Sequence, residues 1–134
     1  MMYDVTTLER DLTAYFGNLL GLVVDSGIFR GQIPESVENG VALRVTGVPE
    51  PSLNDNPTYN VQLYGKFADR DDAWKLCTKC ADYLPVYGEI TEHFNIKFIL
   101  QEGSMSNPVQ IDDKGKKKQF ASVNMRVSVL TRQA

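Results

Sequence analysis

The chain has 134 residues and a mass of 15.0 kDa, the size of one compact domain, and we expect a single domain over residues 1–134. Hydrophobic residues make up 43% and charged residues 23%, which excludes a disordered, collagen-like or coiled-coil protein. Fourteen basic and 17 acidic residues give a net charge of −3, which argues against tight binding of nucleic acid through overall charge.

The first residues carry no basic region ahead of an apolar one, and the longest near-apolar stretch, residues 19–24, is much shorter than the ~18 residues that a membrane span needs. The two cysteines, Cys77 and Cys80, are too few for a disulfide framework. We therefore expect a protein of a reducing cytoplasm that is neither exported nor embedded in a membrane.

An amphipathic helix is predicted from Thr6 to Leu20, because Thr6 and Glu9 form a capping-box pattern and apolar residues recur at helical spacing. Glycines end this helix, and a short strand is expected within residues 28–33. A second helix is predicted after Asp69, an N-cap residue, and ends before Pro85.

Alternating apolar residues predict four further strands, at residues 41–46, 59–67, 94–100 and 121–129. The fold class expected from this order is α+β: a mainly antiparallel four- to five-stranded sheet with two helices packed on one face, in the order α-β-β-β-α-β-β. The second face of the sheet would be either solvated or buried by other subunits. Its predicted residents are Asn60, Gln62, Tyr64, Lys66, Asn95, Lys97, Ile99, Gln101, Ser122, Asn124, Arg126, Ser128 and Leu130.

A long loop or arm is expected at residues 102–119, because this segment lacks periodicity and exceeds the ~12–15 residues of ordinary connections. Near its end, a turn at Gly115 is surrounded by four lysines, Lys114, Lys116, Lys117 and Lys118. This basic patch is interpreted either as a solvated hairpin tip or as an arm that becomes ordered on a partner or faces phosphates.

Catalytic motifs are missing from the sequence. There is no nucleophile elbow and no phosphate-binding loop, and His93 is the only histidine. Cys77 and Cys80 have C-x-x-C spacing, but they fall two turns inside the predicted second helix, beyond the reach of its N-terminal dipole, and both lie on its apolar stripe. We interpret them as small buried hydrophobic residues. We expect no catalytic, cofactor-binding or metal-binding residues, and hence no cofactor.

Several segments, taken in order along nearly the whole chain, share a pattern with one family: IFRGQIPES (28–36), GVAL (40–43), VTGVP (45–49), VQLYGK (61–66), DAW (72–74), Pro108, DDKG (112–115) and FASVNMRV (120–127). The sequence resembles the minor capsid or tail terminator proteins of long-tailed bacteriophages and their prophages. The resemblance implies an α+β subunit without enzymatic activity, which joins a hexameric ring on the head-proximal end of the tail tube.

The resemblance also implies partners and a location. The partners would be further copies of the chain, the tail tube protein and a head-completion or neck protein, with DNA passing through the lumen without sequence-specific binding. The protein would lie in the tail or neck of the virion, and in the bacterial cytoplasm before assembly. The outward-facing charges predicted to serve subunit, tube or lumen contacts are Arg44, Lys66, Lys97, Arg126, Lys114, Lys116, Lys117 and Lys118.

Two alternatives stay open. The first is a small α+β metal- or redox-active enzyme or ligand-binding domain that uses Cys77, Cys80 and His93. The second is a monomeric nucleic-acid-binding module that uses the lysine patch, against which net acidity counts. The sequence fixes neither the ring size nor whether the free subunit is a monomer, and it does not separate a terminator from a neck protein of similar fold.

Overall fold

The computed structural model describes residues 5–47, 57–103, 108–113 and 115–132. Lys114, one of the predicted interface residues, lies outside them. The elements within the described residues are α1 (Val5–Leu20), β1 (Ile28–Arg30), β2 (Gly40–Gly47), β3 (Thr58–Phe67), α2 (Arg70–Tyr83), β4 (Val86–Ile90), β5 (Phe94–Gln101), β6 (Val109–Asp113) and β7 (Lys116–Thr131). Neither of these helices is long and apolar enough to cross a membrane.

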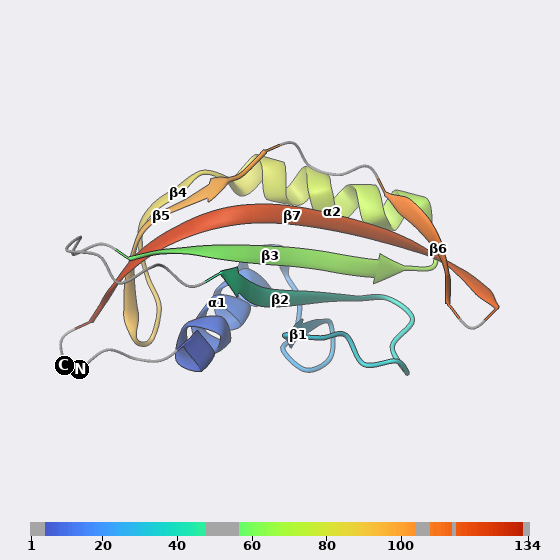
Figure 1. Ribbon diagram of the computed structural model, residues 1–134, viewed down its shortest axis with the longest axis horizontal. Helices are drawn as coiled ribbons and strands as arrows, with labels where there is room; N and C mark the ends of the chain where they lie inside the picture. Colours follow the sequence, from blue (N-terminus) through green and yellow to red (C-terminus); the bar gives the residue numbers. More distant parts are fainter. Residues whose placement is uncertain (1–4, 48–56, 104–107, 114, 133–134) are drawn as a thin grey trace.

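The predicted sheet was wrong in strand number and element order. Within the described residues the structure has seven strands in one mixed sheet, and the element order is α-β-β-β-α-β-β-β-β. Six strands follow the order β1-β2-β3-β7-β5-β4, and β6 pairs with the first part of β7 (Figure 1). β1 and β2 are parallel, whereas the other pairs are antiparallel.

The two strands that the sequence analysis missed are short. β4 has five residues and only its first side chain, Val86, is buried, so no alternation marks it. β6 also has five residues and lies inside the segment predicted to be a loop or arm. It forms a hairpin with the start of β7, in which Asp113 is opposite Lys116. We call this β6–β7 hairpin, residues 109–120, the arm.

The predicted capping signal marks the start of α2 but not the start of α1. Asp69 is the N-cap of α2, as predicted, and its side chain accepts a hydrogen bond of 2.9 Å from the backbone N–H of Asp71. The capping box predicted at Thr6 and Glu9 was wrong, because α1 already begins at Val5. The Glu9 carboxylate instead accepts a hydrogen bond from the backbone N–H of Val45, at 3.0 Å, on β2.

The main hydrophobic core lies between the two helices and one face of the sheet. Leu8, Leu12 and Phe16 of α1 share it with Leu76 of α2 and with alternate residues of the strands. At Gly65 the contact with α2 is so close that an added Cβ would lie 2.8 Å from the Leu76 Cδ2 atom. Both helices therefore cover the same face, and we call the other face the open face (Figure 1).

A β-bulge at Lys97 changes which side chains of β5 face the core. Ile96 pairs with Val129, but the next pairs are Phe98 with Ser128 and Ile99 with Val127. Ile99 is consequently fully buried in the main core, whereas Phe98 is only half-buried. The prediction that Ile99 lies on the second face of the sheet was wrong, because one extra residue reverses the alternation.

Part of the open face is covered by the chain itself. Residues 31–39 turn back over it, and a second, smaller core forms from Phe29, Ile33 and Ala42, with Val37 and Tyr64 packed against it. The open face is therefore neither fully solvated nor wholly left for other subunits.

Candidate interaction surfaces

The arm places its lysines in different environments. Lys116 and Lys117 are exposed, as the solvated-tip and partner-binding interpretations both require. Lys118 is not: its side chain is only 7% exposed and its Nζ atom lies 4.0 Å from the Glu38 carboxylate. Lys116 lies at the same distance from that carboxylate. The segment that covers the open face thus reaches the arm through Glu38, near Lys116 and Lys118.

The arm also carries apolar side chains. Val109 is 55% and Ile111 39% exposed, two of the most exposed large hydrophobic residues among those described. They were not predicted as surface residues, because this segment was predicted to be a loop. The base of the arm is fixed to the body, since the Arg70 guanidinium donates a hydrogen bond of 3.4 Å to the backbone carbonyl of Pro108.

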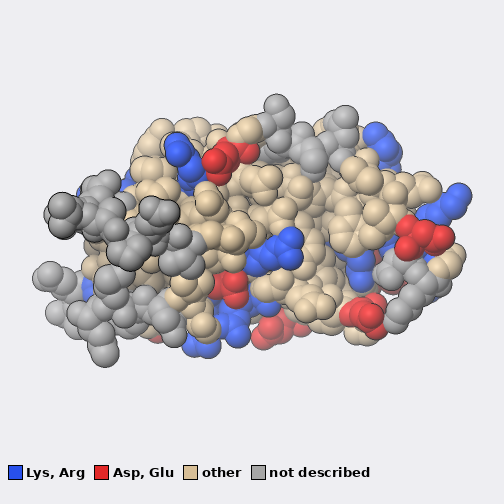
Figure 2. Space-filling view, viewed as in Figure 1, with Lys and Arg blue, Asp and Glu red and all other residues tan. Residues whose placement is uncertain are grey.

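The open face contains a shallow hollow of about 370 Å³ beside the arm. Arg44 lies at its edge with its guanidinium 4.9 Å from the centre of the Tyr64 ring, and its Nε atom donates a hydrogen bond of 2.8 Å to the Gln62 side chain. These contacts hold an exposed cation in one orientation. The space-filling view shows basic and acidic side chains interspersed over mostly uncharged surface, without a single charged field (Figure 2).

The other predicted interface cations are divided by burial. Arg126 on β7 and Lys97 at the bulge are exposed and available to a partner. Lys66 is only 6% exposed although it belongs to the open face, where it pairs with Gly40 and Phe120. Strand alternation gives the face of a side chain but not what covers it, which is why Lys66 and Lys118 were predicted to be accessible.

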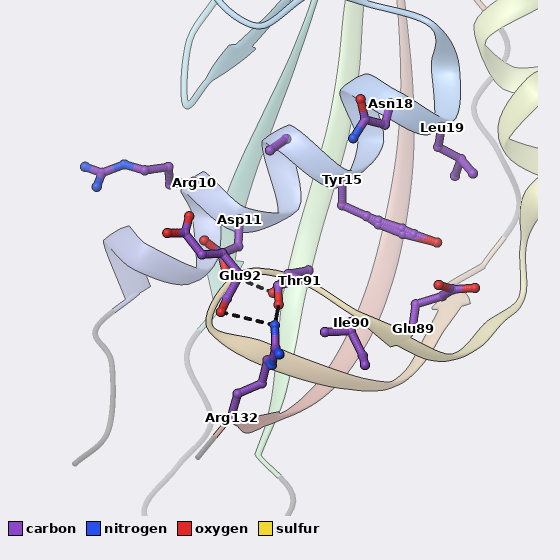
Figure 3. Close-up of a pocket in the computed structure, with 11 residues that line it drawn as sticks. Arg10, Asp11, Tyr15, Asn18, Leu19, Glu89, Ile90, Thr91, Glu92 and Arg132 are labelled. Atoms are coloured by element: carbon purple, nitrogen blue, oxygen red, sulfur yellow. Dashed lines mark hydrogen bonds between the residues drawn. The ribbon is translucent and has the colours of Figure 1, made fainter. Parts of the chain in front are cut away.

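A larger cleft, of about 620 Å³, lies between α1 and the β4–β5 turn (Figure 3). Its residues, which the sequence analysis did not single out as a site, are Arg10, Asp11, Ala14, Tyr15, Asn18, Leu19, Glu89, Ile90, Thr91, Glu92 and Arg132.

Asp11 joins the two walls of this cleft. Its Oδ2 atom accepts hydrogen bonds of 2.8 Å from the Thr91 hydroxyl and from the backbone N–H of His93. Its Oδ1 atom lies 3.0 Å from the His93 Nδ1 atom. The side chain is 3% exposed, so this carboxylate is buried but fully engaged, and it ties the β4–β5 turn to α1.

The remaining polar groups give the cleft a rim that carries both acidic and basic side chains. Glu89 faces Tyr15 (Figure 3), and the pKa of the Tyr15 phenol is raised, first by burial and second by the negative charge of Glu89. Arg132 is held in place because its guanidinium donates a hydrogen bond of 2.8 Å to the Thr91 carbonyl. Both Arg10 and Glu92 are exposed at the rim.

Asp11, Glu92 and His93 are also the one group of described residues whose ligand atoms could surround a metal ion, since these atoms lie within 4.8 Å of one another. Glu92 and His93 belong to the turn before β5, where the His93 Nε2 atom lies 3.9 Å from the Glu92 carboxylate. The oxygens of Asp11 are already used by donors from the turn, which explains this arrangement without a metal.

Cys77 and Cys80 are buried in the main core, on the face of α2 that meets the sheet. Burial raises the pKa of both thiols, and that of Cys80 reaches about 12 through burial and, second, through the neighbouring Cys77. Neither cysteine belongs to the group around His93 among the described residues. The structure therefore does not bring together the three residues of the metal or redox alternative.

Asp11 could have been detected from the sequence. It occupies a position on the apolar stripe of α1, between Leu8 and Leu12, where a carboxylate is rare unless it is paired. Its partners could not have been detected, because they lie about 80 residues away in the sequence.

Comparison with known proteins adds no assignment: no protein-family model matches this chain, and no curated protein shows significant sequence similarity to it.

Proposed function

We propose that this protein is a structural subunit of a long-tailed bacteriophage or prophage, which forms a ring on the head-proximal end of the tail tube and provides the surface on which the head docks. Its partners in this proposal are other copies of itself, the tail tube protein and a neck protein. DNA passes through the lumen of the ring without sequence-specific contacts. The proposed role needs neither a catalytic group nor a cofactor.

The observation that carries this proposal is the ordered resemblance of the sequence to the tail terminator family, together with where the similar segments lie. The segments 28–36, 40–43, 61–66 and 120–127 fall on or directly beside β1, β2, β3 and β7. These four strands are consecutive in the sheet. These four segments therefore lie side by side in the fold, as expected if the resemblance reflects a shared architecture and not isolated motifs.

Several surface features support an assembly role. Arg44, Lys97, Arg126, Lys116 and Lys117 are exposed and remain the proposed charges for contacts with other subunits, the tube or the lumen. Large apolar side chains are exposed at both the arm and the β4–β5 hairpin, and exposed apolar residues grouped in this way are typical of interaction sites. A ring would shield them from water.

The test is a mass measurement by light scattering, with and without the tail tubes of the phage or prophage that encodes the chain. The expected result is a ring of about six 15.0-kDa subunits, either free or only on the tubes, visible by electron microscopy at one tube end. A protein that stays at 15.0 kDa and does not bind the tubes would refute the proposal. Stoichiometric zinc in the purified protein would favour the alternative metal-binding domain instead.

A further inference from the structure

The two ends of the molecule differ in chemistry. The arm lies at one end of the long axis, and the β4–β5 turn with its cleft lies at the other (Figure 1). The arm presents Val109, Ile111 and the exposed Lys116 on one face of the hairpin and the exposed Lys117 on the other. The cleft end presents Ile90, which is 61% exposed, and Tyr87, which is 65% exposed, beside two exposed carboxylates, those of Glu89 and Glu92.

We propose that the arm of one copy docks into the cleft between α1 and the β4–β5 turn of a second copy. In this contact Val109 and Ile111 meet the apolar wall formed by Tyr15, Leu19 and Ile90, and Lys116 and Lys117 lie against Glu89 and Glu92. This inference rests on the proposed ring, because it names the contact that would join neighbouring subunits.

Charge complementarity supports this occupant. Lys116 and Lys117 are exposed on the arm, with two exposed acidic side chains described beside them, Asp112 and Glu38, and the Glu38 carboxylate lies 4.0 Å from the Lys116 Nζ atom. In the cleft, one of the two arginines, Arg132, already donates a hydrogen bond to the carbonyl of Thr91. The carboxylate of Glu89 faces Tyr15, whose pKa is raised by burial and further by this negative charge. Lysines entering from a second copy would neutralise the carboxylates, and Asp112 could approach Arg10 at the rim.

The edges of the sheet provide the second reason. On one side of the sheet the edge strand is β1, and the chain itself covers part of this edge. The N–H of Ile28 donates to the carbonyl of Val23, the carbonyl of Ile28 accepts from the N–H of Asp25, and beyond β1 the N–H of Val45 donates to Glu9. The other outer strands, β4 and β6, both lie on the side of β7 opposite β3.

Strand pairing through β4 and β6 would join equivalent sides of two molecules, which produces a two-fold dimer. A ring needs a contact between two different surfaces. The arm and the cleft satisfy this requirement, because they are different surfaces at opposite ends of the long axis (Figure 1).

Cross-linking of cysteine variants tests the contact directly. Chains carrying Ile111→Cys are mixed with chains carrying Ile90→Cys under oxidising conditions, and the disulfide-linked heterodimer is measured. The native Cys77 and Cys80 are buried and contribute little background. The matched control replaces Ile90→Cys by Tyr83→Cys, since Tyr83 is also exposed but lies on α2. We expect a heterodimer with Ile90→Cys and little with Tyr83→Cys; equal yields would overturn the proposal.

Charge reversal provides an independent readout. Lys116→Glu with Lys117→Glu, or Glu89→Lys with Glu92→Lys, should each lower the cross-link yield about tenfold, and a mixture of the two reversed chains should restore it. These side chains are exposed, so the urea midpoint should not change, and it serves as the folding control. If rings form on tail tubes but are insensitive to either reversal, the arm–cleft contact is wrong while the proposed function stands. If the Ile111→Cys and Ile90→Cys chains do not cross-link and the wild-type chain does not bind tubes, both are wrong.

Discussion

Replacing Ile99 by alanine tests the bulge that sets the register of β5. The Ile99 side chain is fully buried and pairs across the sheet with Val127, which is also fully buried. Truncating such a side chain removes its burial and leaves a cavity, which costs about 2–5 kcal/mol in the free energy of unfolding. With a urea m-value of about 1–3 kcal/mol/M for a protein of this size, the midpoint should fall by roughly 1–2 M.

The matched control is Leu100→Ala, one residue further along the same strand. Leu100 pairs with Arg126 on the open face and is only half-buried, so its truncation should cost less than about 1.5 kcal/mol. Urea unfolding followed by circular dichroism measures both variants. Regular alternation from Phe94 would place Leu100 inside and Ile99 outside, so a larger loss for Leu100→Ala than for Ile99→Ala would refute the bulge.

Two further predictions concern Asp11 and the cysteines. Asp11→Ala removes the acceptor of the Thr91 hydroxyl and of the His93 N–H, so it should lower the free energy of unfolding by roughly 1–3 kcal/mol and speed hydrogen exchange at the His93 amide. The control, Asn18→Ala on the exposed side of α1, should do neither. Unchanged exchange in Asp11→Ala would contradict the link between the turn and the helix. With its pKa at about 12, Cys80 at pH 8 has a thiolate fraction roughly a thousandfold below that of a thiol of pKa 9.0. Its reaction with a thiol reagent should therefore be slow in the native protein and rapid in urea. Fast labelling of the native protein would disprove the burial of this thiol.

The sequence predicts those parts of this fold that depend on neighbouring residues. Asp69 begins α2 because its side chain caps the first turn, and this signal lies within three residues. The long runs of β3 and β7 alternate regularly, so they were predicted as strands. The parallel pairing of β1 with β2 depends instead on the path of residues 31–39 over the sheet edge, which alternation does not encode.

Burial of the predicted interface residues depends on long-range packing and could not be predicted. The register places Lys66 and Lys118 on the open face. They occupy the strand positions that alternate with core-facing residues, where solvated side chains are expected. They are buried because the segment of residues 31–39 packs over that end of the face, where Glu38 reaches Lys118. Arg44 and Arg126 lie further along the strands and remain exposed.

This division of the open face restricts where a partner can bind on it. The end of the sheet beside the arm is occupied by the second core, whereas Asn60, Asn124 and Arg126 are exposed on the central strands. Such a surface of amides and two arginines, Arg44 and Arg126, suits weak, sequence-independent contacts with a passing phosphate backbone better than tight binding, which would need many cations. The charges of the proposed contact between subunits lie elsewhere, on the arm and at the cleft. In the proposed ring, an open face that lines the lumen would therefore leave these two surfaces to the contacts between subunits.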